Sequence, residues 1–323
     1  MQNNRRRKVS FVVPCYNEQT TIPIYYDTMN ALLKKKIIDD LLYEFVFVDD
    51  GSTDDTLKVL EELQTKDEHV HYVSFSRNFG KEAALLAGMA NSTGNYVVTM
   101  DVDLQDPPEL IADMYHAVVI EGYDCAAARR VNRKGEGRIR SFFSNAFYAV
   151  MNNLADVKIA SGARDYRFMR RSMVNAVLSI GEYNRFSKGI FNWVGFQCKW
   201  IEYENVERSA GKTKWSLFKL FAYAKDGIIA FSTKLLSIAS TLGICFCIIA
   251  FMALIFIVVR AAIYGDPVAG WPSTMCVIVL LGGLQLLCIG ILGAYLSKVY
   301  LETKRRPIYI IREQDNRLTD EDW

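Results

Sequence analysis

The sequence lacks the glycine-rich loops that mark two common classes of nucleotide-binding α/β protein. No GxGxxG motif follows the first predicted strand, and no GxxxxGK[ST] motif occurs in the 323 residues. These absences argue against a dinucleotide-binding fold and against a P-loop nucleoside triphosphatase. Histidine is scarce as well: only His69, His71 and His116 are present, and none lies in the polar motifs described below.

A strong excess of charge of either sign is also missing. Lysine and arginine number 38 and aspartate and glutamate 36, which gives a net charge of +2. This balance gives no reason to expect nucleic acid or another bulk polyanion as a partner.

The seven cysteines show neither a disulfide framework nor the spacing of a metal site. Four fall within long apolar segments, and the other three are scattered along the chain: Cys15, Cys125 and Cys198. We therefore expect the thiols to be reduced, as is usual in a cytoplasmic domain.

Charged residues are absent from two long segments near the C-terminus, 235–259 and 267–297. Each exceeds the ~20 apolar residues that a helix needs to cross a bilayer. A buried core helix would explain one such segment, but two in succession favour two transmembrane helices within residues 234–300.

The distribution of positive charge predicts how these segments are oriented. The short connector YGDPVAGW carries no lysine or arginine, whereas the outer flanks carry Lys225, Lys234, Lys298, Lys304, Arg305 and Arg306. The positive-inside rule then predicts a multi-pass protein of the cell membrane with both termini in the cytoplasm. The basic N-terminus MQNNRRRKVSF runs into a predicted strand rather than a long apolar region, so we expect no signal peptide.

Before residue 110, apolar β-branched runs alternate with helical patterns. Strands are expected at residues 8–14, 44–50, 69–76 and 95–103, and a helix follows each of the first three. Alternation at this spacing is typical of βαβ units and predicts an α/β fold with a mainly parallel sheet.

Polar residues cluster where these predicted strands end. Asn17 and Glu18 follow the first strand, Asp49 and Asp50 close the second, and the acidic stretch 101–106 follows the fourth. In open parallel sheets, ligands bind at the carboxyl ends of the strands. Three polar clusters on one edge therefore indicate a single site assembled from separate loops.

The turn DDGSTDDT offers Ser52 or Thr53 as the N-cap of the second helix. Capping does not account for Asp49 and Asp50, because both precede the cap. These two acids therefore stay candidates for the site.

The segment TMDVDLQDPPEL, residues 99–110, allows two interpretations. Its acids and prolines are typical of a surface turn, but clustered oxygen atoms are also the ligands of a hard divalent cation. The neighbouring polar loops and the apolar segments favour the cation. We assign Asp106 to the turn and place Met100 in the preceding strand.

Two later segments are basic. Six arginines and lysines lie between residues 129 and 140, which fits either a solvated surface or a site for an anionic substrate or lipid phosphate. Residues 211–233 mix apolar and basic side chains in the way of helices that lie in the membrane interface, although a core helix with an exposed lysine face is the alternative. The tail, residues 301–323, is charged, and we expect a short strand there.

Four motifs, VVPCYNE, FVFVDDGSTDDT, RNFGKEAALLAG and MDVDLQDPPE, together resemble the family 2 glycosyltransferases. RDYRFMRR, RFSKGIFNWVGF, RSAGKTKWS and the paired apolar segments extend the resemblance over nearly the whole chain. The subgroup it points to is the polyprenyl-phosphate glycosyltransferases, which are related to dolichyl-phosphate mannose synthase and bacterial undecaprenyl-phosphate glucosyltransferases. It implies a GT-A type domain at residues 1–210, a nucleotide-diphosphate-sugar donor, a polyprenyl phosphate acceptor, and a homo-oligomer such as a tetramer.

The resemblance also implies roles for individual residues. Those matching the donor site are Pro14, Tyr16, Asn17, Glu18, Asp49, Asp50, Lys81, Asp101, Arg208 and Lys214. Those matching the lipid-phosphate site are Arg129, Arg140 and Ser144. Asp103 and Gln105 match the ligands of Mg²⁺ or Mn²⁺, and the implied catalytic set is Asp101, Asp103, Arg129 and Arg140.

The implied chemistry agrees with these residue types. A divalent cation bridging two phosphates neutralises a pyrophosphate leaving group, and carboxylate and amide oxygens suit such a cation. The acceptor, a lipid monophosphate, is ionised near neutral pH and needs no strong general base. In-line attack on the anomeric carbon would invert its configuration, with UDP-glucose the favoured donor and UDP-N-acetylglucosamine next.

Two other functions remain open from the sequence. A processive polysaccharide synthase would carry a QxxRW-type motif, which this chain lacks, and two spans are few for a polymer channel. A non-catalytic membrane scaffold or flippase subunit that kept the fold would have little reason to retain Asp101, Asp103, Gln105 and the arginines together.

Overall fold

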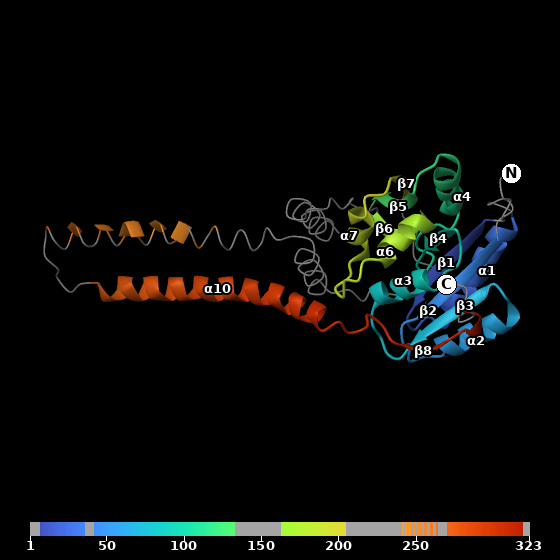
Figure 1. The fold of residues 1–323 in the computed structure, drawn as a ribbon, viewed down its shortest axis with the longest axis horizontal. Helices are drawn as coiled ribbons and strands as arrows, with labels where there is room; N and C mark the ends of the chain where they lie inside the picture. The colour runs from blue at the N-terminus through green and yellow to red at the C-terminus, as the bar shows by residue number, and fades with distance from the viewer. Residues whose placement is uncertain are drawn as a thin grey trace. The chain divides into compact units, whose positions relative to one another are not determined.

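The computed structural model describes residues 7–35, 42–132, 163–204 and 270–318, and individual positions between 241 and 263. Its described part divides into two compact units. The first holds an eight-stranded sheet, and the second holds the long helix α10 (Figure 1).

The sheet has the strand order β7-β5-β6-β4-β1-β2-β3-β8. The strands are β1 Lys8–Cys15, β2 Leu42–Asp49, β3 Val70–Phe75, β4 Tyr96–Thr99, β5 Cys125–Asn132, β6 Ala163–Arg170, β7 Cys198–Glu204 and β8 Ile311–Gln314. Strands β3, β2, β1 and β4 run parallel to one another, and β5 runs parallel to β7. Strand β6 pairs antiparallel with β4 and β5, and β8 pairs antiparallel with β3. The predicted α/β fold with a largely parallel sheet is confirmed.

Helices cover both faces of this sheet. They are α1 Thr21–Lys34, α2 Thr56–Lys66, α3 Lys81–Ala90, α4 Leu110–Tyr115 continued by η1 His116–Ile120, α6 Arg171–Leu178 and α7 Ser187–Trp193. The side chains of α1, α2 and α4 pack against one face, and α3, α6 and α7 contact the other. Gly88 lets α3 approach the sheet, because a Cβ there would lie 2.3 Å from a methyl carbon of Val12.

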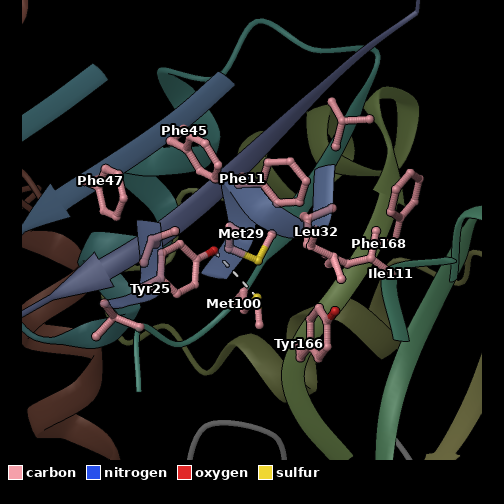
Figure 2. Close-up of a cluster of buried hydrophobic side chains, with 14 of the residues drawn as sticks. Phe11, Tyr25, Met29, Leu32, Phe45, Phe47, Met100, Ile111, Tyr166 and Phe168 are labelled. Carbon is pink, nitrogen blue, oxygen red and sulfur yellow. Dashed lines mark hydrogen bonds between the residues drawn. The ribbon is translucent and has the colours of Figure 1, made fainter. Parts of the chain in front are cut away.

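Aromatic and aliphatic side chains of alternate strand positions build the larger core (Figure 2). The rings of Phe11 and Phe45 on neighbouring strands pack in a tilted arrangement with their centroids 5.3 Å apart, and Tyr25 of α1 meets Phe45 edge-on. The Tyr25 hydroxyl lies 3.6 Å from the sulfur of Met100. The alternation of inward side chains along β1 and β2 is what the sequence pattern predicts for strands in a sheet.

The fourth strand is shorter than predicted. It ends at Thr99, so the assignment of Met100 to the strand was wrong, although Met100 is buried and its N–H still donates to the carbonyl of Val12 at 3.1 Å. The chain turns after it, and Leu104 has a positive φ of 52°. The acids that follow β4 therefore lie in this turn and not in the sheet.

The helix α2 also begins later than predicted. It starts at Thr56 with Asp55 at the N-cap position, so Ser52 and Thr53 are not caps. Both residues instead bond to the loop after β1, as described below.

The second unit contains α10, Trp271–Thr303. Its 33 residues make a helix roughly 50 Å long at ~1.5 Å per residue. Within it, Leu280–Thr303 is long and apolar enough to cross a membrane, with a mean hydropathy of 1.8, and none of it is buried. Among the described residues this is one candidate span.

The first predicted span and the predicted interface helices fall largely outside the described residues. The positions that are described between 241 and 263 are helical, and their large apolar side chains are exposed. Two spans are therefore not confirmed.

The tail returns to the first unit. The predicted short strand is present as β8, which pairs antiparallel with β3 at the edge of the sheet. Asp315 anchors it, because its buried carboxylate lies 2.8 Å from Nδ1 of His71 and 2.9 Å from the guanidinium of Arg317.

Candidate functional site

The loops after β1 and β2 are bonded to each other. Asn17, in the left-handed region at φ 56°, donates its N–H to the hydroxyl of Ser52 at 2.9 Å and accepts the N–H of Thr53 at 2.8 Å. The N–H of Glu18 donates to the hydroxyl of Thr56 at 2.8 Å. Tyr16 stays 45% exposed beside them. Two of the predicted polar clusters therefore form one continuous rim.

The two acids that close β2 are buried and hydrogen-bonded within the protein. Asp49 accepts the N–H of Ser52 at 3.0 Å and the hydroxyl of Ser74 at 2.8 Å, one on each carboxylate oxygen. Asp50 accepts the N–H groups of Phe79 at 2.7 Å and Gly80 at 2.9 Å. Burial raises the pKa of Asp50 despite these two donors.

Gly51 lies between this loop and the next. It has a φ of 65°, and a Cβ there would lie 2.3 Å from the backbone of Arg77. Together with Asp50 it fixes the turn before α3. The described hydrogen bonds of Asp49 and Asp50 hold loops of the protein in place. Direct contact of either acid with a nucleotide-sugar therefore stays a prediction.

Lys81, the first residue of α3, bridges two carboxylates. Its Nζ lies 2.6 Å from Oδ1 of Asp101 and 2.8 Å from Oδ2 of Asp165. Burial opposes the ammonium charge, but the two acids outweigh it and raise the pKa of Lys81. In turn Lys81 and Lys188 overcome burial and lower the pKa of Asp165, so Asp165 is held ionised.

Sequence reasoning missed Asp165. It lies within β6 rather than after a parallel strand, so the rule that points to strand ends did not select it. The same helix start contributes a second missed acid, Glu82, whose carboxylate accepts the N–H of Ser187 at 2.8 Å and also its hydroxyl. Burial, and after it Asp165, raise the pKa of Glu82.

Asp103 and Gln105 lie together in the turn after β4. The N–H of Gln105 donates to Oδ1 of Asp103 at 3.2 Å. The Nε2 atom of Gln105 is buried without a hydrogen-bond partner. Among the described residues no three His, Cys, Asp or Glu side chains cluster as a complete metal site.

These residues fit a divalent cation that is shared with a phosphate ligand. Mg²⁺ is commonly held by one or two carboxylates and completed by substrate phosphates and water. The carboxylate of Asp103 and the amide oxygen of Gln105 are ligands of this kind, whereas the buried Nε2 of Gln105 is a hydrogen-bond donor that suits a phosphate oxygen rather than the cation. A cation held by protein side chains alone would need more ligands than this turn provides.

Asp106 is not the surface turn residue that we predicted. It is 4% exposed, accepts the hydroxyl of Tyr203, and lies 3.3 Å from Nε of Arg164. Burial raises the pKa of Asp106, while Arg164 and Tyr203 oppose the shift. Its neighbours come from β6 and β7, which the sequence pattern did not place beside it.

Of the predicted lipid-phosphate residues, the described part of the chain contains Arg129. It lies on β5 with its Nη1 3.5 Å from Glu202. Arg140, Ser144, Arg208 and Lys214 lie outside the described residues. Pro14 is in β1, paired in register with Val48 at the carboxyl end of the strands.

The described site therefore unites the ends of β1, β2 and β4 with the start of α3. Its partly exposed acids lie after β4, next to a lysine, and its buried acids hold the loops. An α/β sheet with this edge resembles that of a glycosyltransferase domain of the GT-A type.

The chain belongs to glycosyl transferase family 2, whose model matches residues 10–178. It is 39% identical to a bactoprenol glucosyl transferase of Shigella phage SfX, over 95% of this chain and 99% of that protein. A prophage bactoprenol glucosyl transferase homolog of Escherichia coli (strain K12) is also 39% identical, over 94% of this chain and 98% of that protein. The predicted family is confirmed, and these names support the predicted polyprenyl-phosphate subgroup.

Two further likenesses extend this picture. CsbB of Bacillus subtilis (strain 168), which is named as a glycosyltransferase, is 40% identical over 94% of this chain and 91% of its own length. Glucosyl-3-phosphoglycerate synthase of Mycobacterium tuberculosis, solved with Mn²⁺, uridine diphosphate and glucosyl-3-phosphoglycerate, is 20% identical with a TM-score of 0.44. It covers 69% of this chain and 78% of that one. A likeness at this score supports no statement about ligands of the present protein.

Proposed function

We propose that the protein transfers a sugar from a nucleotide-diphosphate-sugar to a polyprenyl phosphate such as undecaprenyl phosphate. UDP-glucose is the favoured donor and UDP-N-acetylglucosamine the next. The observation that carries the proposal is the pair of full-length relatives named as bactoprenol glucosyl transferases, combined with the acidic edge after β4.

The described residues have distinct tasks in this reaction. Asp103 and Gln105 would hold Mg²⁺ or Mn²⁺, which when bound supplies charge neutralisation to the departing diphosphate. The rim of Tyr16, Asn17 and Glu18 would receive the nucleoside part of the donor. Lys81 fixes Asp101 and Asp165, so that both carboxylates keep one orientation.

The acceptor needs little activation, because a phosphate monoester is already an anion near neutral pH. We therefore assign no general base to it. Attack from the face opposite the diphosphate inverts the anomeric carbon and yields a lipid-phosphate sugar. Arg129 and, beyond the described residues, Arg140 and Ser144 are proposed to bind the lipid phosphate.

Membrane attachment through α10 is part of the proposal, and the sheet topology supports the number of crossings. Strands β7 and β8 belong to one sheet, so both ends of the segment between them would lie on the same side of a membrane. That segment would then cross the bilayer an even number of times. If α10 is one crossing, a second precedes it, and we propose two spans with both termini cytoplasmic.

The test uses the full-length protein in detergent with undecaprenyl phosphate and Mn²⁺ or Mg²⁺. Labelled UDP-glucose, UDP-N-acetylglucosamine and GDP-mannose are supplied separately, and the lipid product is identified by mass. We expect a lipid-phosphate hexose with UDP-glucose, and no product when the metal is chelated. Absence of labelled lipid with all three donors would refute the proposal.

A further inference from the structure

Two cysteines lie directly opposite each other on neighbouring strands. Cys125 of β5 and Cys198 of β7 are partners in the parallel register, and their sulfur atoms are 3.2 Å apart. Neighbouring strands lie about 4.8 Å apart, which is within the ~4.4–6.8 Å that separates the Cα atoms of disulfide-bonded cysteines. A bond between the two sulfurs can therefore close without separating the strands.

A buried arginine lies beside this pair. Arg167 of β6 is fully buried, and its Nη1 lies 4.0 Å from the sulfur of Cys198. Its guanidinium stacks over the rings of Phe191 at 4.6 Å and Trp200 at 5.4 Å. The Nε and Nη2 atoms of Arg167 have no hydrogen-bond partner. A buried guanidinium that lacks acceptors favours a neighbouring anion, and a thiolate is such an anion.

The two thiols differ in accessibility and acidity. Cys125 is fully buried, whereas Cys198 is only partly buried. The hydrogen bond that joins the two sulfurs, together with the charge of Arg167, outweighs burial and lowers the pKa of Cys198. Burial raises the pKa of Cys125. Cys198 is thus suited to attack first and Cys125 to follow.

We propose that Cys125 and Cys198 form a redox-active dithiol that a low-molecular-weight disulfide oxidises to an intramolecular disulfide. The Cys198 thiolate attacks one sulfur of the reagent, forms a mixed disulfide and releases the first small thiol. The Cys125 sulfur then attacks the sulfur of Cys198 and releases the second. The protein loses two protons and two electrons, and the reagent takes them up to become two free thiols.

Among the described residues neither cysteine is bonded to the acids after β4, so the dithiol is proposed as a site separate from sugar transfer. In the reducing cytoplasm the pair stays reduced, and it closes when the ratio of disulfide to thiol rises. Strands β5 and β7 would then be joined covalently across the outer part of the sheet.

The experiment treats the full-length protein in detergent with glutathione disulfide, quenches with acid, alkylates the remaining thiols under denaturing conditions and maps the peptides by mass. We expect a linked Cys125–Cys198 peptide that has lost two hydrogens and is restored by dithiothreitol. The buried Cys15 serves as an internal control: it should stay a free thiol during oxidation and should therefore be alkylated after denaturation.

Matched variants separate the two steps. Cys125→Ser should stop at a stable glutathione adduct on Cys198, and Cys198→Ser should leave Cys125 unmodified. Each should keep wild-type transfer activity under reducing conditions, which establishes that it is folded. Absence of the linked peptide at excess oxidant, or equal adduct formation on Cys125 in the Cys198→Ser variant, would overturn the proposal.

Discussion

The acids that close β2 and those that follow β4 look alike in sequence but differ in their surroundings. Asp49 and Asp50 are 2% and 4% exposed, and their oxygens accept hydrogen bonds from the protein's own loops. Asp101 and Asp103 lie in a turn that is partly exposed, where one meets Lys81 and the other adjoins an amide with an unpartnered end. Burial and partners thus separate acids that hold the site from acids that can bind a ligand.

The largest effect is expected for Asp103→Ala, which tests whether the acids after β4 bind the metal. Loss of a metal ligand removes several kcal/mol of charge stabilisation in the transition state, so turnover should fall by about a thousandfold. The thermal unfolding midpoint should stay close to that of the wild type. Asp113→Ala, which removes an exposed acid from α4, is the matched control and should leave the rate unchanged. Near-normal turnover in the Asp103 variant would disprove the metal assignment.

The next effect concerns Lys81→Met. Without the bridge, Asp101 and Asp165 repel each other and lose their fixed orientation, and we expect turnover to fall by about ten- to a hundredfold. Lys188→Met removes a positive charge near Asp165 but keeps the bridge, so its loss should be much smaller. Equal losses in both variants would mean that net charge, not the bridge, matters.

The same substitution should change the pH dependence of turnover. Lys81 helps to hold the pKa of Asp165 below its ordinary value of 3.8, so this acid stays ionised as the pH falls. In Lys81→Met that pKa rises, and Asp165 is protonated at a higher pH. The acid limb of the pH–rate profile should therefore move to higher pH. An unmoved acid limb would show that turnover does not depend on the ionised form of Asp165.

On the other side of the comparison, Asp50→Ala should act on stability. It leaves the N–H groups of Phe79 and Gly80 without an acceptor, which costs roughly 1–3 kcal/mol in the free energy of unfolding. Thermal unfolding measures this cost. Asp55→Ala, an exposed acid in the same loop whose side chain caps no helix, should change stability little. If Asp50→Ala weakened metal binding without destabilising the fold, Asp50 would belong with the ligand-binding acids.

The smallest effect is expected for Tyr203→Phe, which sharpens the comparison at the boundary of the two groups. Asp106 follows β4 in sequence but is buried like the acids after β2. Removing the Tyr203 hydroxyl leaves the carboxylate of Asp106 with Arg164 as its remaining partner. The free energy of unfolding should fall by about 1 kcal/mol, with little change in turnover. A loss of turnover larger than the loss of stability explains would place Asp106 in the reaction.

The sequence predicted the first four strands and the edge on which the acids gather, because local apolar patterns and βαβ spacing determine both. It did not predict β6 or the antiparallel pairing of β6 and β8, although it placed a short strand in the tail, since these pairings depend on residues far apart in the chain. Asp165 and the burial of Asp106 were missed for this reason. Both depend on β6 lying beside β4 and β5, which no local pattern records.

The same limit applies to Asp49 and Asp50. Their position after β2 was evident, but three of their donors, Ser74, Phe79 and Gly80, come from β3 and the loop after it. A sequence motif shows where an acid stands along the chain. It does not show whether the acid's oxygens are already used.

The most direct measurement of the central claim is a calorimetric titration of UDP-glucose into the full-length protein with and without Mn²⁺, in the wild type and in Asp103→Ala. We predict that Mn²⁺ strengthens binding to the wild type and leaves binding to the variant at the metal-free level. An equal gain from Mn²⁺ in both proteins would contradict the assignment of the acids after β4 as the metal-binding edge of a glycosyltransferase.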